Sequence, residues 1–186
     1  MKIACLGWGS LVWDPRSIPI LGEWFNDGPI LPIEFARESS DGRITLVIAA
    51  VGYRVQSLWS LMSSANIEEA KKALAEREGI SDANIQHSIG CWDGETSKLL
   101  GRCADVIGAW AERNNIDAVV WTNLKCGFKG SRGEMPTCIE ITEHLHSLPD
   151  EKKKVAREYI CKAPLQIDTE FRRKIQAELG WGTVNI

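Results

Sequence analysis

Glu78 is the residue of this sequence best placed to act as a general base. It closes a helix predicted over residues 67–78, before the terminating Gly79. The apolar face of that helix is formed by Ile67, Ala70 and Leu74. At 100° per residue Glu78 falls on the same face, at the negative end of the helix dipole. Burial and the dipole both disfavour a charged carboxylate, which suits proton transfer near neutral pH. The alternative is a frayed, solvated helix end in which Lys71 neutralises Glu78.

A glycine-containing loop after the first predicted strand is the second candidate. Its residues are Gly7, Trp8, Gly9, Ser10 and Leu11. Glycine lets the backbone adopt positive φ and approach a ligand closely, and successive backbone N–H groups in such a turn can form an anion-binding nest. The Ser10 hydroxyl adds a polar group. The alternative is a tight turn that packs Trp8 into the core.

Other chemistry-bearing residues give weaker signals. The segment Cys126–Gly133 lies between a strand and a helix, as a phosphate-binding loop would, but lacks the Gly-Lys-Ser/Thr sequence, so a flexible loop is favoured. No two of the six cysteines are spaced CxxC, and the histidines and cysteines form no spacing typical of a metal site. Cys91 is a possible nucleophile, although a buried, inert thiol is commoner.

Composition favours one globular domain over residues 1–186. Hydrophobic residues make up 44% of the chain, enough to bury a packed core. The formal net charge is −3 and Lys152–Lys154 is the sole basic block, so no nucleic-acid partner is expected. The longest apolar run, Ile44–Val51, is too short to span a bilayer, and no signal-peptide apolar region precedes Gly7. We therefore expect a cytoplasmic protein with reduced cysteines and no membrane partner.

Hydrophobic periodicity predicts a mixed α+β fold that positions these candidates. Strands are expected over residues 2–6, 32–38, 43–50, 54–62, 85–89 and 117–124, and helices over residues 67–78 and 97–113. Asp41-Gly42 is a hairpin signal, and residues 15–32 are expected to be irregular. Helix caps are expected at Asn66, Thr137, Asp150 and Thr169.

Taken together, the loop and the Glu78 segment resemble the γ-glutamylcyclotransferase-like superfamily, most closely its ChaC branch. Gly7–Trp13 (GWGSLVW) resembles that branch's YGSLxW loop, with Trp8 where the family usually has Tyr. Leu74–Ile80 (LAEREGI) is similar to the family's LDxxEG segment, in which the Glu is catalytic. Shorter matches follow in the family's order at Ala118–Trp121, Pro136-Thr137, Leu148-Pro149 and Tyr159.

The resemblance implies a small, mostly antiparallel β-barrel with surrounding helices, and a helical insertion at residues 81–115. Family members cyclise a γ-glutamyl group and release 5-oxoproline with an amine or amino acid. By position, Glu78 would be the acid/base. The loop Gly7–Leu11 would bind a small anionic γ-glutamyl ligand, with the backbone N–H groups of Gly9, Ser10 and Leu11 on its α-carboxylate.

The implied reaction requires no metal or redox cofactor. The substrate's own α-amino group attacks its γ-carbonyl, and holding that chain folded contributes up to roughly 7–11 kcal/mol as effective molarity. Two other functions remain open. One is a non-catalytic module on the same fold that binds a small anion, and the less favoured one is a thiol enzyme using Cys91 or Cys126.

Overall fold

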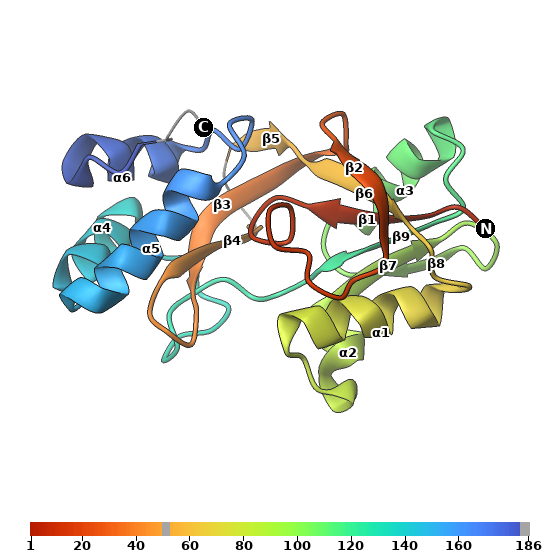
Figure 1. Ribbon diagram of the computed structural model, residues 1–186, viewed down its shortest axis with the longest axis horizontal. Coiled ribbons are helices and arrows are strands. Elements are labelled where there is room, and N and C mark those ends of the chain that lie inside the picture. The colour runs from red at the N-terminus through yellow and green to blue at the C-terminus, as the bar shows by residue number, and fades with distance from the viewer. Residues whose placement is uncertain (50–52, 183–186) are drawn as a thin grey trace. The chain divides into compact units, whose positions relative to one another are not determined.

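The protein has an α+β fold, shown in Figure 1 as a computed structural model that describes residues 1–49 and 53–182. Its strands are β1 (Ile3–Gly7), β2 (Ile20–Phe25), β3 (Ile30–Glu38), β4 (Ile44–Ile48), β5 (Arg54–Gln56), β6 (Leu58–Met62), β7 (Ile89–Asp93), β8 (Lys98–Leu100) and β9 (Ala118–Thr122). Its helices are α1 (Ile67–Glu78), α2 (Ile85–Ser88), α3 (Ala104–Arg113), α4 (Cys138–Ser147), α5 (Asp150–Lys162) and α6 (Glu170–Leu179), with a 3₁₀ turn at Asp82–Asn84.

The chain forms two compact units, each assembled from separate stretches. The first unit contains Met1–Gly7, Asp14–Ile30 and Gln56–Leu124. The second contains Trp8–Trp13, Leu31–Val55 and Lys125–Ile186. The loop that follows β1 therefore belongs to the second unit over Trp8–Trp13, and the chain returns to the first unit at Asp14.

The first unit is built on a six-stranded sheet in the order β2-β6-β1-β9-β7-β8. β1 and β9 pair in parallel, and the other paired strands run antiparallel. The inner strands β1 and β7 are buried along their whole length, as expected for strands covered on both faces. α1 packs against β7 and β9, and α3 packs against β7, β8 and β9.

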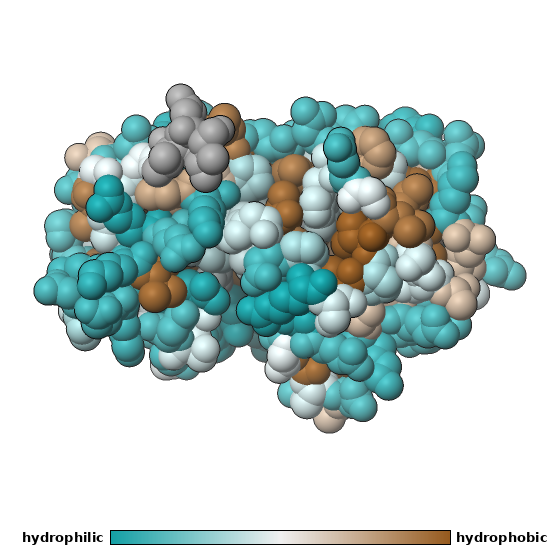
Figure 2. Space-filling model, viewed as in Figure 1, coloured by the Kyte–Doolittle hydropathy of each residue, from teal (hydrophilic) through white to brown (hydrophobic). Residues whose placement is uncertain are grey.

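The edge strand β2 differs from these inner strands because four of its six residues are exposed. Leu21 is 51% exposed and Phe25 is 47% exposed, and Figure 2 shows apolar side chains gathered over the region of β2 and β6. The Phe25 ring lies 4.7 Å from the Trp59 ring, measured between centroids. This strand lies within residues 15–32, where the sequence predicted no regular structure, so that prediction was wrong.

The second unit combines a three-stranded sheet, in the order β4-β3-β5, with helices α4, α5 and α6. β3 and β4 pair antiparallel, with Glu38 opposite Ile44, and the intervening loop contains the predicted Asp41-Gly42 turn. Gly42 has φ +90°, which suits glycine. The predicted end of this second strand at Ala50 lies outside the described residues.

The helix caps were the most accurate predictions. α1 has the predicted bounds, Asn66 accepts a hydrogen bond from the Glu69 N–H, and Gly79 ends the helix in the left-handed conformation. Thr137 forms the predicted capping box with Glu140 at the start of α4, and Thr169 caps α6. Pro149, rather than Asp150, occupies the capping position of α5.

The segment 81–115 departs most from its prediction. The helix expected from Ser97 begins only at Ala104, because Lys98–Leu100 form β8 and Cys103 has φ +60°, which is not helical. The strand expected at residues 85–89 is the short helix α2 up to Ser88, and β7 starts at Ile89. The segment expected to be a helical insertion therefore also supplies two strands to the sheet.

Neither sheet closes on itself in the part of the chain that the structure describes, so the barrel implied by the resemblance is not seen there. No helix within residues 1–49 and 53–182 has the length and apolar character needed to span a membrane.

Candidate functional site

Glu78 occupies the last position of α1, in the first unit. The helix end is well defined rather than frayed, because the Gly79 N–H donates to the carbonyls of Ala75 and Glu76. The Glu78 side chain is 19% exposed, so it is partly buried. The solvated helix end considered as the alternative is therefore not what the structure shows.

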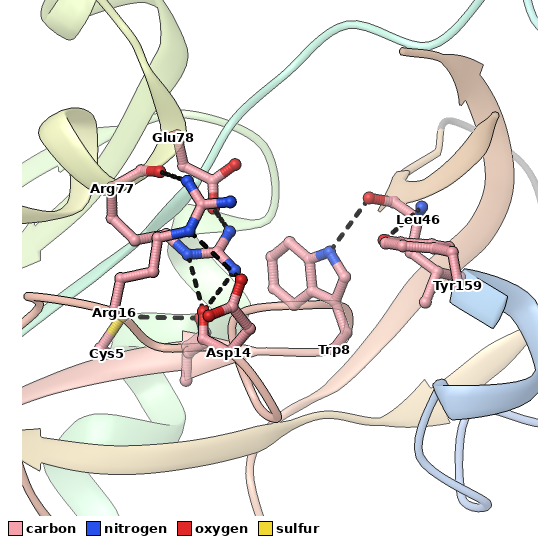
Figure 3. A network of polar contacts seen from close by, with 9 residues as sticks. Cys5, Trp8, Asp14, Arg16, Leu46, Arg77, Glu78 and Tyr159 are labelled. Atoms are coloured by element: carbon pink, nitrogen blue, oxygen red, sulfur yellow. Dashed lines mark hydrogen bonds and ion pairs between the residues drawn. The ribbon is translucent and has the colours of Figure 1, made fainter. Parts of the chain in front are cut away.

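Arg77 is the ionic partner of Glu78. Its Nη1 lies 2.5 Å from Glu78 Oε1, and the Arg77 side chain is only 4% exposed (Figure 3). The same guanidinium donates through Nε and Nη2 to the carbonyl oxygen of Asp14, at 3.2 and 2.7 Å. The predicted neutralising partner, Lys71, pairs instead with Glu68 at 2.9 Å. A fully bonded arginine thus fixes the carboxylate and supplies a counter-charge.

Arg16 joins the Asp14 segment to the same helix end. Its Nη1 donates to the Arg77 carbonyl oxygen at 3.3 Å, and its Nε donates to Asp14 Oδ2 at 3.2 Å. Arg16 and Arg77 therefore hold the turn after residue 13 and the end of α1 together from both sides. Figure 3 shows Asp14, Arg16, Arg77 and Glu78 as one polar cluster.

The thiol of Cys5 is buried, and its pKa is shifted by the charges of Glu78 and Arg77 as well as by burial. Burial raises the pKa of Cys5 strongly, the Glu78 charge raises it further, and Arg77 acts in the opposite direction. Burial likewise raises the pKa of Cys91, and Cys126 is only 5% exposed. The raised pKa disfavours a thiolate nucleophile at Cys91, and the burial of Cys126 limits its access to a substrate.

The loop residues Trp8–Trp13 belong to the second unit, whereas Gly7 is the last residue of β1 in the first. The Val12 N–H donates to the Gly9 carbonyl oxygen at 2.9 Å, which closes a turn. Trp8 is 3% exposed and its Nε1 donates to the Leu46 carbonyl oxygen at 3.3 Å. Its indole is therefore a core group, as the alternative interpretation of this loop predicted.

Tyr159 of α5 lies directly against the loop. A Cβ atom added at Gly9 would come within 2.4 Å of the Tyr159 hydroxyl oxygen, so glycine is required for this close approach. That hydroxyl accepts a hydrogen bond from the Leu46 N–H at 3.3 Å. The ring meets Trp13 edge-on at 5.4 Å, and the Arg43 guanidinium lies over it at 5.3 Å.

The backbone donors predicted to bind an anion are partly available. Among the described residues, neither the Gly9 N–H nor the Leu11 N–H donates a hydrogen bond to another protein group. Ser10 between them is partly exposed. Gly9, Ser10 and Leu11 therefore share one loop of the second unit, and Glu78 is held in the first.

The segment Cys126–Gly133, for which the sequence favoured a flexible loop, is held by internal hydrogen bonds. Its turns are closed by bonds from the Ser131 N–H to the Phe128 carbonyl and from the Gly133 N–H to the Cys126 carbonyl. Arg132 donates to the carbonyl oxygens of Gly127 and Glu38. The arginine therefore stabilises the loop itself. Within residues 1–49 and 53–182, no cluster of His, Cys, Asp and Glu could hold a metal ion.

Sequence reasoning missed Asp14, Arg16 and Arg77, and it used Tyr159 only as part of a motif. Arg77 could have been suspected because it directly precedes Glu78. The Asp14 and Arg16 contacts could not, because they join positions more than 60 residues apart. Searches of family models, curated proteins and solved structures found no match to this chain.

Proposed function

We propose that the protein is a divergent γ-glutamylcyclotransferase-like enzyme that converts a small γ-glutamyl compound into 5-oxoproline and an amine or amino acid. We also propose that the protein has the family's barrel-type fold. It would act in the cytoplasm, where its free cysteines stay reduced. Glu78 is the acid/base. The loop Gly7–Leu11 binds the ligand, with the N–H groups of Gly9, Ser10 and Leu11 on its α-carboxylate.

The observation that supports this function best is the fixed position of the Glu78 carboxylate. A glutamate at a helix end ordinarily points into water and samples many rotamers. Here the side chain is 19% exposed and lies 2.5 Å from Arg77, whose remaining donors grip the Asp14 carbonyl. Catalysis by proton transfer needs such a positioned carboxylate, with a free oxygen to accept a proton.

The proposed reaction transfers two protons from the attacking nitrogen to the leaving nitrogen and exchanges one C–N bond for another. Glu78 takes a proton from the substrate's α-ammonium group, and the freed amine attacks the γ-carbonyl carbon. The new C–N bond closes a five-membered lactam. The old bond from that carbon to the leaving nitrogen then breaks as protonated Glu78 donates its proton to that nitrogen. The Glu78 carboxylate takes the second proton from the lactam nitrogen and passes it to the released amine, which leaves as an ammonium ion. Atoms and charge balance without an external reagent.

A direct assay tests this function. The protein is incubated with a panel of γ-glutamyl amino acids, peptides and amides, and 5-oxoproline is measured by mass spectrometry together with the released amine. Equal amounts of the two products are expected from at least one compound. If no compound on the panel yields 5-oxoproline, the proposed function is wrong.

The non-catalytic alternative has one observation in its favour. Arg77 occupies one Glu78 oxygen at 2.5 Å, so an ion pair within the protein already uses part of this carboxylate. A protein that only binds a small anion would bind γ-glutamyl compounds in calorimetry and leave them intact. Binding without product formation would favour this alternative over the enzyme.

A further inference from the structure

Arg16 combines a costly backbone conformation with an exposed side chain. Its φ is +53°, in the left-handed region that glycine or asparagine adopts at lower cost. A non-glycine residue is energetically disfavoured in this conformation. The turn itself would be satisfied by glycine, so the arginine side chain must be the useful part of this residue.

The Arg16 guanidinium is fixed on one side and open on the other. Nε donates to Asp14 Oδ2 and Nη1 donates to the Arg77 carbonyl oxygen, yet the side chain is 61% exposed. In the described part of the chain, Nη2 donates to no protein group. An anchored guanidinium with one outward edge is prepared to bind a carboxylate through two parallel hydrogen bonds.

This outward edge is carried by the same rigid cluster that holds Glu78. Arg16 bonds the carbonyl of Arg77, and the Arg77 side chain bonds both Glu78 and the Asp14 carbonyl. Any movement of Arg16 relative to Glu78 would break these bonds. Arg16 and Glu78 therefore belong to one bonded cluster of the first unit (Figure 3).

We propose that Arg16 is a specificity-determining residue that binds a carboxylate on the leaving group. This inference rests on the proposed function and narrows its substrate class. The preferred substrates are γ-glutamyl amino acids or peptides with a free C-terminal carboxylate, and γ-glutamyl derivatives of uncharged amines are poor substrates. Asp14 is a positioning residue that orients the guanidinium through Nε.

The test compares γ-glutamylalanine with γ-glutamylalaninamide, which differ in the charge of one terminal group. For the wild type, kcat/KM is expected to favour the acid on the order of tenfold, as for a charge-assisted hydrogen-bond pair. Arg16→Gln should bring the two values close to equality, and Arg16→Lys should retain part of the preference. Arg113→Gln, which changes an exposed arginine at the end of α3, should keep the full preference.

The ratio of kcat/KM for the acid to kcat/KM for the amide distinguishes carboxylate recognition by Arg16 from a purely structural role. Loss of the Arg77 carbonyl contact alone would slow both substrates equally and leave the ratio unchanged, and that outcome overturns the assignment. Equal use of acid and amide by the wild type also overturns it, while the cyclotransferase proposal survives.

If no product forms, the proposed function fails, and calorimetry with the same two compounds decides the role of Arg16. An acid-specific loss of binding in Arg16→Gln supports it, and binding independent of Arg16, or none at all, overturns it.

Discussion

The Arg77 guanidinium controls the environment of Glu78. It is almost fully buried and bonds both the Glu78 carboxylate and the Asp14 carbonyl. Helical periodicity placed Glu78 on the inward face but could not give this partner, because adjacent residues on a helix point in different directions by about 100°. The contact depends on how the two side chains bend at the helix end. Helical periodicity thus predicted that Glu78 faces inward and missed its counter-charge.

The contact between Gly9 and Tyr159 gives a prediction at the same scale. Gly9→Ala would push a methyl group to within 2.4 Å of the Tyr159 hydroxyl oxygen, so the loop or the tyrosine must move. We expect about 1–3 kcal/mol lower unfolding free energy, as for overpacking, measured by urea denaturation.

Two further variants test the cause of that loss. Adding Tyr159→Phe removes the clashing oxygen and should recover part of the lost stability. Gly130→Ala, at a glycine with open space around it, should change stability little. If Gly9→Ala alone is as stable as the wild type, the close approach does not exist.

Among the elements, α6 is fixed by a buried arginine. The Arg172 guanidinium, 6% exposed, donates to four carbonyl oxygens around the end of α5. Those acceptors belong to Ile160, Ala163, Pro164 and Ile167. The guanidinium serves as a cap supplied by one helix to another, since terminal helix carbonyls otherwise lack partners.

Replacing Arg172 should therefore cost far more than replacing its neighbour. Arg172→Met leaves buried carbonyls without donors, and we expect a loss of about 3 kcal/mol or more in unfolding free energy. Arg173→Met removes an exposed ion pair with Asp168 and a contact with the exposed Tyr53 ring, and it should cost under about 1 kcal/mol. Equal losses in urea denaturation would contradict the capping role.

The buried carboxylate of Glu34 makes the attachment of α6 dependent on pH. Glu34 accepts hydrogen bonds from the Thr169 hydroxyl and from the Phe35 and Phe171 N–H groups. Burial raises the pKa of Glu34 despite these donors. A carboxyl with a raised folded-state pKa stabilises the fold when protonated, and this contribution is lost as pH rises through the folded-state pKa.

Glu34→Gln should consequently become more stable relative to the wild type as pH rises from about 4 to about 7. Glu140→Gln should show the opposite trend, because the Thr137 hydrogen bonds lower the pKa of Glu140. Urea denaturation at several pH values measures both differences. A Glu34→Gln difference that stays constant with pH would contradict the effect of burial.

How far each element could be predicted depended on whether local residues define it. α1 and the cap of α4 were predicted well because Asn66, Gly79 and Thr137 satisfy backbone groups within their own turns. β2 was missed because its exposed residues show no alternation of apolar and polar positions. The start of α3 was misplaced because the positive φ of Cys103 interrupts an otherwise helical pattern. Sheet pairing and unfavourable φ values arise from tertiary context.

At the scale of the whole molecule, the chain forms two compact units. Glu78, Arg77 and Arg16 belong to the first unit, and the loop Trp8–Trp13 and Tyr159 belong to the second. The sequence order of these residues could be matched to a family pattern, but the membership of each unit could not be predicted. Each unit combines three separate stretches of chain.

The rate of 5-oxoproline formation by Glu78→Gln tests the central claim most directly. Glutamine keeps the size of the side chain and cannot exchange a proton, so kcat/KM should fall by about 10²–10⁴-fold, the usual contribution of general acid–base catalysis. Glu76→Gln, an exposed position two residues earlier on the same helix, should retain the wild-type rate. Equal rates for Glu78→Gln and the wild type would contradict the assignment of Glu78 as the acid/base.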